Sequence, residues 1–275
     1  AGVIFVVIKL NDYSAQVDSS QFNNSTWFIL IGFSAIYGLA NIILAVAWSN
    51  LLDYFGATTK QLWVLKTYGL TQLAKYVPGN IMHLASRQSM GLAEGIPGWT
   101  LAKSSIWEVC LISLAGSCFI VLVIPVYLQA YSITTYLLMY VFFVLCLILA
   151  LRGIFDKHIA RAFALYIVFL SISGMIFVGL LVLLGGIVLS SISTIVLVFG
   201  AFIIAWTIGV LTPGAPAGLG VREFILLFIL NGVISETDLL LTILLSRVVT
   251  VSGDVFCFLL AAALSKYPQK LKSVH

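Results

Sequence analysis

Two charged residues, Arg222 and Glu223, follow a segment rich in proline and glycine inside an otherwise apolar part of the chain. This segment reads TPGAPAGLGVRE over residues 212–223, and long runs of Leu, Ile, Val and Phe flank it on both sides. A charge at bilayer depth costs roughly 2.5–3.5 kcal/mol on insertion scales. Proline and glycine also interrupt a helix whose backbone finds no hydrogen-bond partners in lipid. The combination predicts a polar site inside a membrane.

The chemistry that this segment favours is anion binding. The planar fork of Arg222 can make two parallel hydrogen bonds to a phosphate group. A half-helix that starts at Val221 would add free N–H groups and the positive end of its dipole. Gly218 and Gly220 would let the backbone approach a ligand closely. We therefore predict a site for an anionic group such as a lipid phosphate.

The composition of the whole chain indicates a membrane protein. Of its 275 residues, 61% are hydrophobic and 9% are charged, whereas a soluble domain has about 25% charged residues. Because a span needs about 20 apolar residues, the chain has room for about seven or eight crossings. The predicted fold is an all-α, polytopic integral membrane bundle that forms a single transmembrane domain over residues 1–275. The small net charge of +4 argues against a nucleic-acid partner.

The apolar runs predict where the spans lie. Six strong spans are expected at residues 26–52, 104–128, 134–151, 162–184, 194–211 and 239–264. The first apolar run, residues 1–10, is too short to span, and we expect it to belong to a helix that begins before Ala1.

The charges in the loops predict the orientation. Nearly all Lys and Arg lie in the loops 53–103 and 152–161 and in the end 266–275, whereas the loops 11–25, 129–133, 185–193 and 234–238 have none. Basic loops stay on the cytoplasmic side, so we expect a cytoplasmic C-terminus. Within the second basic loop, we expect residues 155–161 to form a short connection without helix.

Two Pro-Gly pairs mark broken or re-entrant elements, near residues 60–98 and 212–234. In each element an arginine follows the pair by nine residues: Pro78, Gly79 and Arg87 in the first, and Pro213, Gly214 and Arg222 in the second. The predicted topology makes the two elements enter from opposite sides. Such pairs are typical of transporters built from inverted repeats, although Pro-Gly also marks many ordinary turns.

Seven charged residues lie within or beside the apolar regions. They are Lys75, Arg87, Glu108, Arg222, Glu223, Arg247 and Asp254. Arg247 and Asp254 are seven residues apart, so they share one helix face. One interpretation is that acids and bases pair only to hold helices together. The other is a polar cavity in which arginines bind an anionic headgroup while carboxylates hold the arginines in place. No pattern typical of a metal, cofactor or catalytic site is present, so we expect none of these.

Several of these segments together resemble a known family. Residues 75–80 (KYVPGN) and 212–223, with Arg87, Glu108 and Arg247, resemble the transmembrane region of lysylphosphatidylglycerol synthases, whose stand-alone members are described as flippase-like. The resemblance covers about residues 26–265, and Ala217 departs from it where the family often has glycine. It implies a bundle with re-entrant helices that moves lipids between leaflets. Because the 275 residues include no soluble synthase domain, lysine transfer is not implied.

The leading hypothesis is a lipid transporter or flippase of a prokaryotic plasma membrane. Its cargo would be an anionic phospholipid or a polyprenyl-phosphate glycolipid, since the resembling family also occurs in cell-envelope pathways. One alternative is an integral-membrane transferase that acts on lipid-linked sugars or phosphates. Another is a non-catalytic scaffold of an envelope biosynthesis complex. Besides lipids, the candidate partners are a second copy of the chain or enzymes of envelope biosynthesis.

Overall fold

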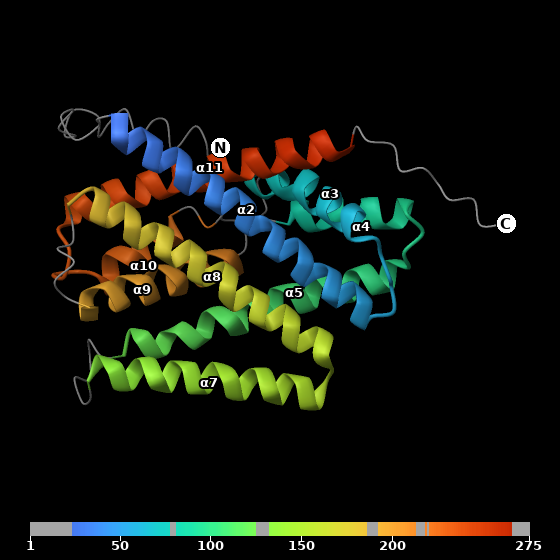
Figure 1. Cartoon of the computed structure of the whole chain (residues 1–275), viewed down its shortest axis with the longest axis horizontal. Coiled ribbons are helices and arrows are strands. Elements are labelled where there is room, and N and C mark those ends of the chain that lie inside the picture. Colours follow the sequence, from blue (N-terminus) through green and yellow to red (C-terminus); the bar gives the residue numbers. More distant parts are fainter. Residues whose placement is uncertain are drawn as a thin grey trace.

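The computed structural model describes residues 24–77, 81–124, 132–185, 192–212, 218 and 220–265, and in this part of the chain every regular element is a helix. Its long helices run side by side along the longest axis of the molecule (Figure 1). The elements, in chain order, are α2 (Asn24–Tyr54), α3 (Gln61–Thr71), η2 (Gln72–Tyr76), α4 (Met82–Ala93), α5 (Gly98–Cys118), η3 (Phe119–Leu122), α7 (Ile133–Ile154), α8 (Lys157–Leu183), α9 (Ile192–Leu211), α10 (Val221–Ile229) and α11 (Glu236–Ser265). The predicted all-α polytopic bundle is therefore confirmed.

Six of these helices are long and apolar enough to cross a membrane within the described ranges: α2, α5 with η3, α7, α8, α9 and α11. Each overlaps one predicted span. Helices α2, α7, α9 and α11 contain theirs completely, whereas α5 with η3 ends at Leu122, before the predicted end at residue 128, and α8 ends at Leu183, one residue before its predicted end. At the start of α11, Ser235 receives a hydrogen bond from the backbone N–H of Asp238 at 3.2 Å, which caps the helix.

The loop predicted at residues 155–161 is wrong for most of its length. Helix α8 begins at Lys157, so the connection from α7 consists of Phe155 and Asp156 alone. The basic residues of this stretch form the first turns of α8, where Lys157 and Arg161 are exposed. Charged residues are compatible with a helix end that reaches water, and the hydropathy pattern cannot distinguish such a turn from a loop.

The short helices lie in opposite halves of the bundle. Helices α3 and α4 occupy the right half of Figure 1, whereas α10 lies in the left half beside the long helix α9. Helix α10 packs against α9, and α4 packs against both α3 and α5. Both segments that were predicted to be broken elements therefore contain short helices packed against longer ones, and their re-entrant character stays a prediction. Their breaks, with Pro78, Gly79, Pro213 and Gly214, lie outside the described residues.

The core that supports these short helices is aromatic and lies between α2, α5, α8 and α9. Trp48, Phe163, Tyr166 and Phe177 are almost completely buried. Helices α2 and α11 approach each other closely at Gly38, where a Cβ atom would lie 2.7 Å from the carbonyl oxygen of Gly253. Helix α2 thus forms a fixed wall against which α8 and α11 both pack.

Candidate functional site

Both broken elements contribute to one cavity of about 290 Å³ near the middle of the bundle. Its polar lining comes from seven helices and the residue that follows α9. These side chains are Tyr37, Tyr68, Gln72, Lys75, Tyr76, His83, Glu108, Thr212, Arg222, Arg247 and Thr250. Phe169 and Trp206 contribute aromatic wall. Charged residues that are far apart in the sequence therefore meet at a single place.

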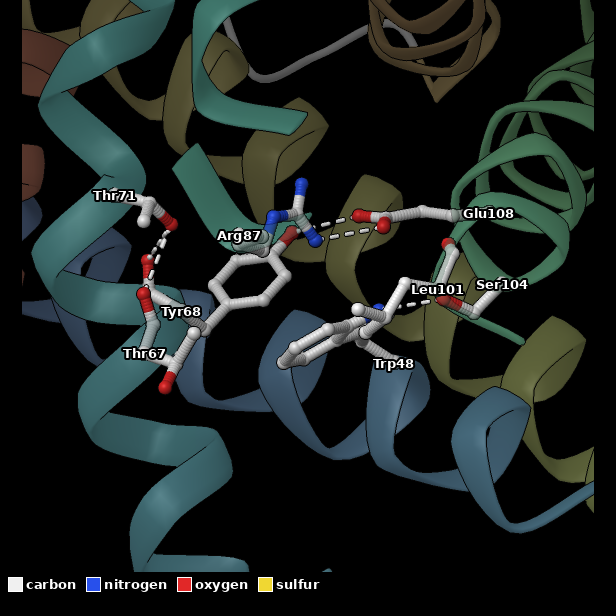
Figure 2. A network of polar contacts seen from close by, with 8 residues as sticks. All are labelled: Trp48, Thr67, Tyr68, Thr71, Arg87, Leu101, Ser104 and Glu108. Atoms are coloured by element: carbon white, nitrogen blue, oxygen red, sulfur yellow. Dashed lines mark hydrogen bonds and ion pairs between the residues drawn. The ribbon is translucent and has the colours of Figure 1, made fainter. Parts of the chain in front are cut away.

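The first charged pair, Arg87 with Glu108, joins α4 to α5. Nη1 of Arg87 lies 2.7 Å from Oε2 of Glu108, and both side chains are buried. Tyr68 donates a hydrogen bond to the other carboxylate oxygen at 3.0 Å. The guanidinium also lies over the ring of Tyr68, 4.3 Å from its centre. Figure 2 shows the three side chains meeting, with Trp48 beside them. Arg87 is thus fully enclosed by its partners.

Trp48 packs beside this network and is itself held by hydrogen bonds. Its indole N–H donates to Oγ of Ser104 at 3.2 Å, and that hydroxyl donates to the carbonyl of Leu101 at 2.9 Å (Figure 2). The ring centre of Trp48 lies 5.5 Å from Cζ of Arg87, within the range of a cation–π contact. The network therefore ties α2 to α4 and α5.

The second pair, Lys75 with Asp254, joins η2 to α11. Nζ of Lys75 lies 2.7 Å from the carboxylate of Asp254, which has no exposed surface. The same carboxylate receives hydrogen bonds from Tyr76, Asn41 and Gln72. Four donors from two elements, η2 and α2, satisfy its oxygens, so this buried acid has the ion-pair and hydrogen-bond partners that a buried charge requires.

The third pair, Arg247 with Glu223, joins α11 to α10. Nη2 of Arg247 lies 2.8 Å from Oε1 of Glu223, and Nε of Arg247 donates to the same oxygen at 3.1 Å. Nη2 also donates to the carbonyl of Gly218 at 3.3 Å. The other carboxylate oxygen of Glu223 is buried and has no hydrogen-bond partner among the described residues. Glu223 therefore holds Arg247 at the cavity and keeps one oxygen unused.

Arg222 differs from the other three basic residues of the site. Within the part of the chain that the structure describes, no carboxylate lies within ion-pair distance of it, and its buried Nε has no hydrogen-bond partner. Its guanidinium lies over Trp206, with Cζ 5.3 Å from the ring centre. It is the cation at the cavity wall that an additional anion could neutralise.

Two glycines make room for the Arg222 side chain. A Cβ atom on Gly209 would lie 2.6 Å from Cγ of Arg222, and one on Gly218 would lie 2.8 Å from its Nε. Gly218 and Gly220 have φ angles of +70° and +84°, a region that favours glycine. These two residues turn the chain into α10, and the close approach of their backbone to a ligand stays a prediction.

The structure places the seven predicted charged residues in two layers. Four of them line the cavity: Lys75, Glu108, Arg222 and Arg247. The other three, Arg87, Glu223 and Asp254, lie behind the wall and pair with a lining residue. Three pairs hold elements together, as the first interpretation expects, and Arg222 has no acid within ion-pair distance among the described residues. The binding of an anionic headgroup stays a prediction.

Several residues of the site were missed by sequence reasoning. Tyr68, Gln72 and Tyr76 are among them. They lie seven and three residues before and one residue after the predicted Lys75, which places all four on one helix face, so this polar stripe could have been found. Gly209 carries no such signal, because its role depends on a side chain from another helix. Among the described residues, no group of three His, Cys, Asp or Glu is close enough to hold a metal ion.

Comparisons with known proteins do not identify a family. No protein-family model matches the sequence, and no curated protein matches it. The similarity to lysylphosphatidylglycerol synthases stays a prediction, and the geometry of the cavity carries the functional interpretation.

Proposed function

We propose that this protein is a flippase-like lipid transporter, which binds the negatively charged headgroup of a lipid in the central cavity and moves it between leaflets. The proposal rests mainly on Arg222, a cation without an acidic partner at the wall of a cavity inside an apolar bundle. A buried charge without a counter-ion is costly. A transient anionic ligand explains why the chain keeps this charge.

The rim of the cavity supports a lipid as the ligand. Ile81 and Leu211 belong to the cavity lining and are 63% and 48% exposed. In a membrane, exposed apolar residues at this depth would face acyl chains. A headgroup could then lie against Arg222 and Arg247 while its tails stay in the bilayer. The carboxylates of Glu223 and Asp254 would hold Arg247 and Lys75 in place.

A scaffold without transport activity would also contain buried ion pairs, and the three pairs of the site fit that alternative. It does not account for Arg222 or for the cavity beside it. In our proposal the pairs position the cavity wall, and Arg222 contacts the cargo. By the distribution of basic residues and the family resemblance, the protein would lie in a prokaryotic plasma membrane with its C-terminus in the cytoplasm.

The test is leaflet exchange of a tail-labelled anionic phospholipid in vesicles that contain the purified protein. We expect Arg222→Ala to lower the exchange rate at least about tenfold, because a hydrogen bond to a charged group contributes about 1.5–3 kcal/mol. Arg152→Ala is the matched control, since Arg152 is an exposed arginine at the end of α7 and lies outside the cavity lining. Equal rates for wild type and Arg222→Ala would refute the role of Arg222.

A further inference from the structure

The charges around the cavity can be counted pair by pair. Lys75, Arg87 and Arg247 each lie within 2.8 Å of a separate carboxylate. Arg222 remains as the one additional positive charge among the Lys, Arg, Asp and Glu residues that line the cavity or pair with its lining. The breaks at 78–80 and 213–217 contain no ionisable side chain in the sequence. With histidine neutral, the empty site therefore has a surplus of one positive charge.

This surplus determines which lipid charge the site can bind without leaving an uncompensated charge. A ligand with one negative charge makes the loaded site neutral, and a neutral site is favoured in a medium of low dielectric constant. A phosphate monoester carries close to two negative charges above pH 7, so it would leave one uncompensated. A zwitterionic headgroup would leave the charge of Arg222 in excess.

The volume of the cavity points in the same direction. About 290 Å³ lies at the lower end of the roughly 300–1,000 Å³ that is typical of ligand pockets. Tyr68, Gln72 and Thr250 add neutral hydrogen-bonding groups to the wall, which suit hydroxyl groups beside a phosphate. The space therefore favours one phosphate with a compact neutral substituent.

Building on the proposed function, we infer that the cargo is a lipid phosphodiester with one net negative charge and a compact, uncharged headgroup. Two sources supply this chemistry: a glycerophospholipid such as phosphatidylglycerol, and a polyprenyl phosphate that carries a single sugar. Arg222 would contact the phosphate oxygens from α10, and Arg247 would contact them from α11 while Glu223 holds its guanidinium.

The inference is tested by binding of short-chain phospholipids to the detergent-solubilised protein, measured by titration calorimetry at pH 8. The probes are dihexanoyl phosphatidylcholine, phosphatidylglycerol and phosphatidic acid, with net charges near zero, minus one and minus two. We expect phosphatidylglycerol to bind at least about tenfold more tightly than either of the others, because an uncompensated charge at bilayer depth costs more than a factor of ten in affinity. Equal or tighter binding of phosphatidic acid would overturn the inference.

Two variants that each change the charge of the site by one unit should move the ligand preference in opposite directions. Glu223→Gln keeps an oxygen for Arg247 and adds one positive charge to the site, so phosphatidic acid should become the preferred ligand. Arg222→Gln removes the surplus, so phosphatidylcholine should bind at least as well as phosphatidylglycerol. If both variants are folded by size-exclusion chromatography and keep the ligand order of the wild type, the charge count is refuted. If only one variant is folded, the order in which it binds the three lipids tests the charge count by itself.

Exchange assays in vesicles test two further points: which class of lipid supplies the phosphodiester, and whether the bound lipid is transported. One arm compares labelled phosphatidylglycerol with phosphatidic acid, and the other compares a polyprenyl-phosphate hexose with the corresponding diphosphate. We expect the phosphodiester to move faster in at least one arm, and that arm identifies the source. Charge-selective binding without any exchange would refute the proposed transport but support the phosphodiester. Faster exchange of the dianionic lipid in both arms would support transport and refute the phosphodiester.

Discussion

Removal of one partner from the Arg87–Glu108 pair should destabilise the protein strongly. In Glu108→Leu the guanidinium of Arg87 keeps only its contacts with the rings of Tyr68 and Trp48. Its side chain is 3% exposed, so water cannot replace the lost carboxylate. Breaking a buried pair in this way costs about 3–5 kcal/mol. At about 1.4 kcal/mol per factor of ten, the folded-to-unfolded ratio should fall roughly 100- to 4,000-fold.

Removal of both charges should cost much less. In Arg87→Leu with Glu108→Leu no uncompensated charge remains, and an apolar replacement of a whole buried pair is often neutral or stabilising. The hydroxyl of Tyr68 loses its acceptor, which costs about 1–3 kcal/mol. The double variant should therefore be at least about 1 kcal/mol more stable than the Glu108→Leu variant. The net charge around the cavity is unchanged, so its ligand preference should also be unchanged.

The measurement is equilibrium unfolding in mixed micelles with increasing SDS, followed by circular dichroism, for the wild type, both single variants and the double variant. The cycle isolates the coupling between the two side chains. A Glu108→Leu variant within about 0.5 kcal/mol of the wild type, or effects of the two single changes that add without coupling, would show that Arg87 does not depend on Glu108. The geometric argument for the pairs of the cavity wall would then be unsound.

Two further variants test how the cavity residues are positioned. Gly209→Ala should lower lipid exchange about as strongly as Arg222→Ala, because the added methyl group occupies the place of the Arg222 side chain. The control is Gly153→Ala, since no atom lies within 4 Å of the Cβ that it adds. Equal exchange rates for the two variants would contradict the role of Gly209 in making room for Arg222. Asp254→Asn should lower the SDS unfolding free energy by about 3–5 kcal/mol, because the ammonium of Lys75 loses its counter-ion, and Lys75→Met in the same chain should recover at least half of that loss. A second substitution that brings no recovery would show that the cost does not come from the lysine.

Hydropathy was enough to predict the long helices, and the rarity of charges was enough to select the charged residues that gather around the cavity. Every buried charge in an apolar bundle needs a partner or a cavity, so residues such as Arg247 and Glu108 could be selected without coordinates. The helix ends were less predictable, as Lys157 shows, because a polar turn at the water boundary can belong either to a helix or to a loop.

The pairing of the charges could not be predicted. Four basic and three acidic residues allow many combinations, and the spacing of Arg247 and Asp254 on one helix face suggested that they could neutralise each other. In the structure each of them pairs with a residue of a broken element instead. Which acid meets which base depends on the rotation and depth of the short helices, and these follow from tertiary packing that leaves no pattern in the sequence.

In the proposed transport, α11 connects the two broken elements, because it forms one ion pair with each of them. Lys75 of the first broken element binds to Asp254, and Glu223 of the second binds to Arg247. Seven residues at 1.5 Å each separate the two attachment points by about 10.5 Å along the helix. Any movement of one broken element relative to the other must therefore stretch or exchange an ion pair on α11. An anion that draws Arg247 away from Glu223 would loosen one attachment and leave the other intact, which couples headgroup binding to movement of a single broken element.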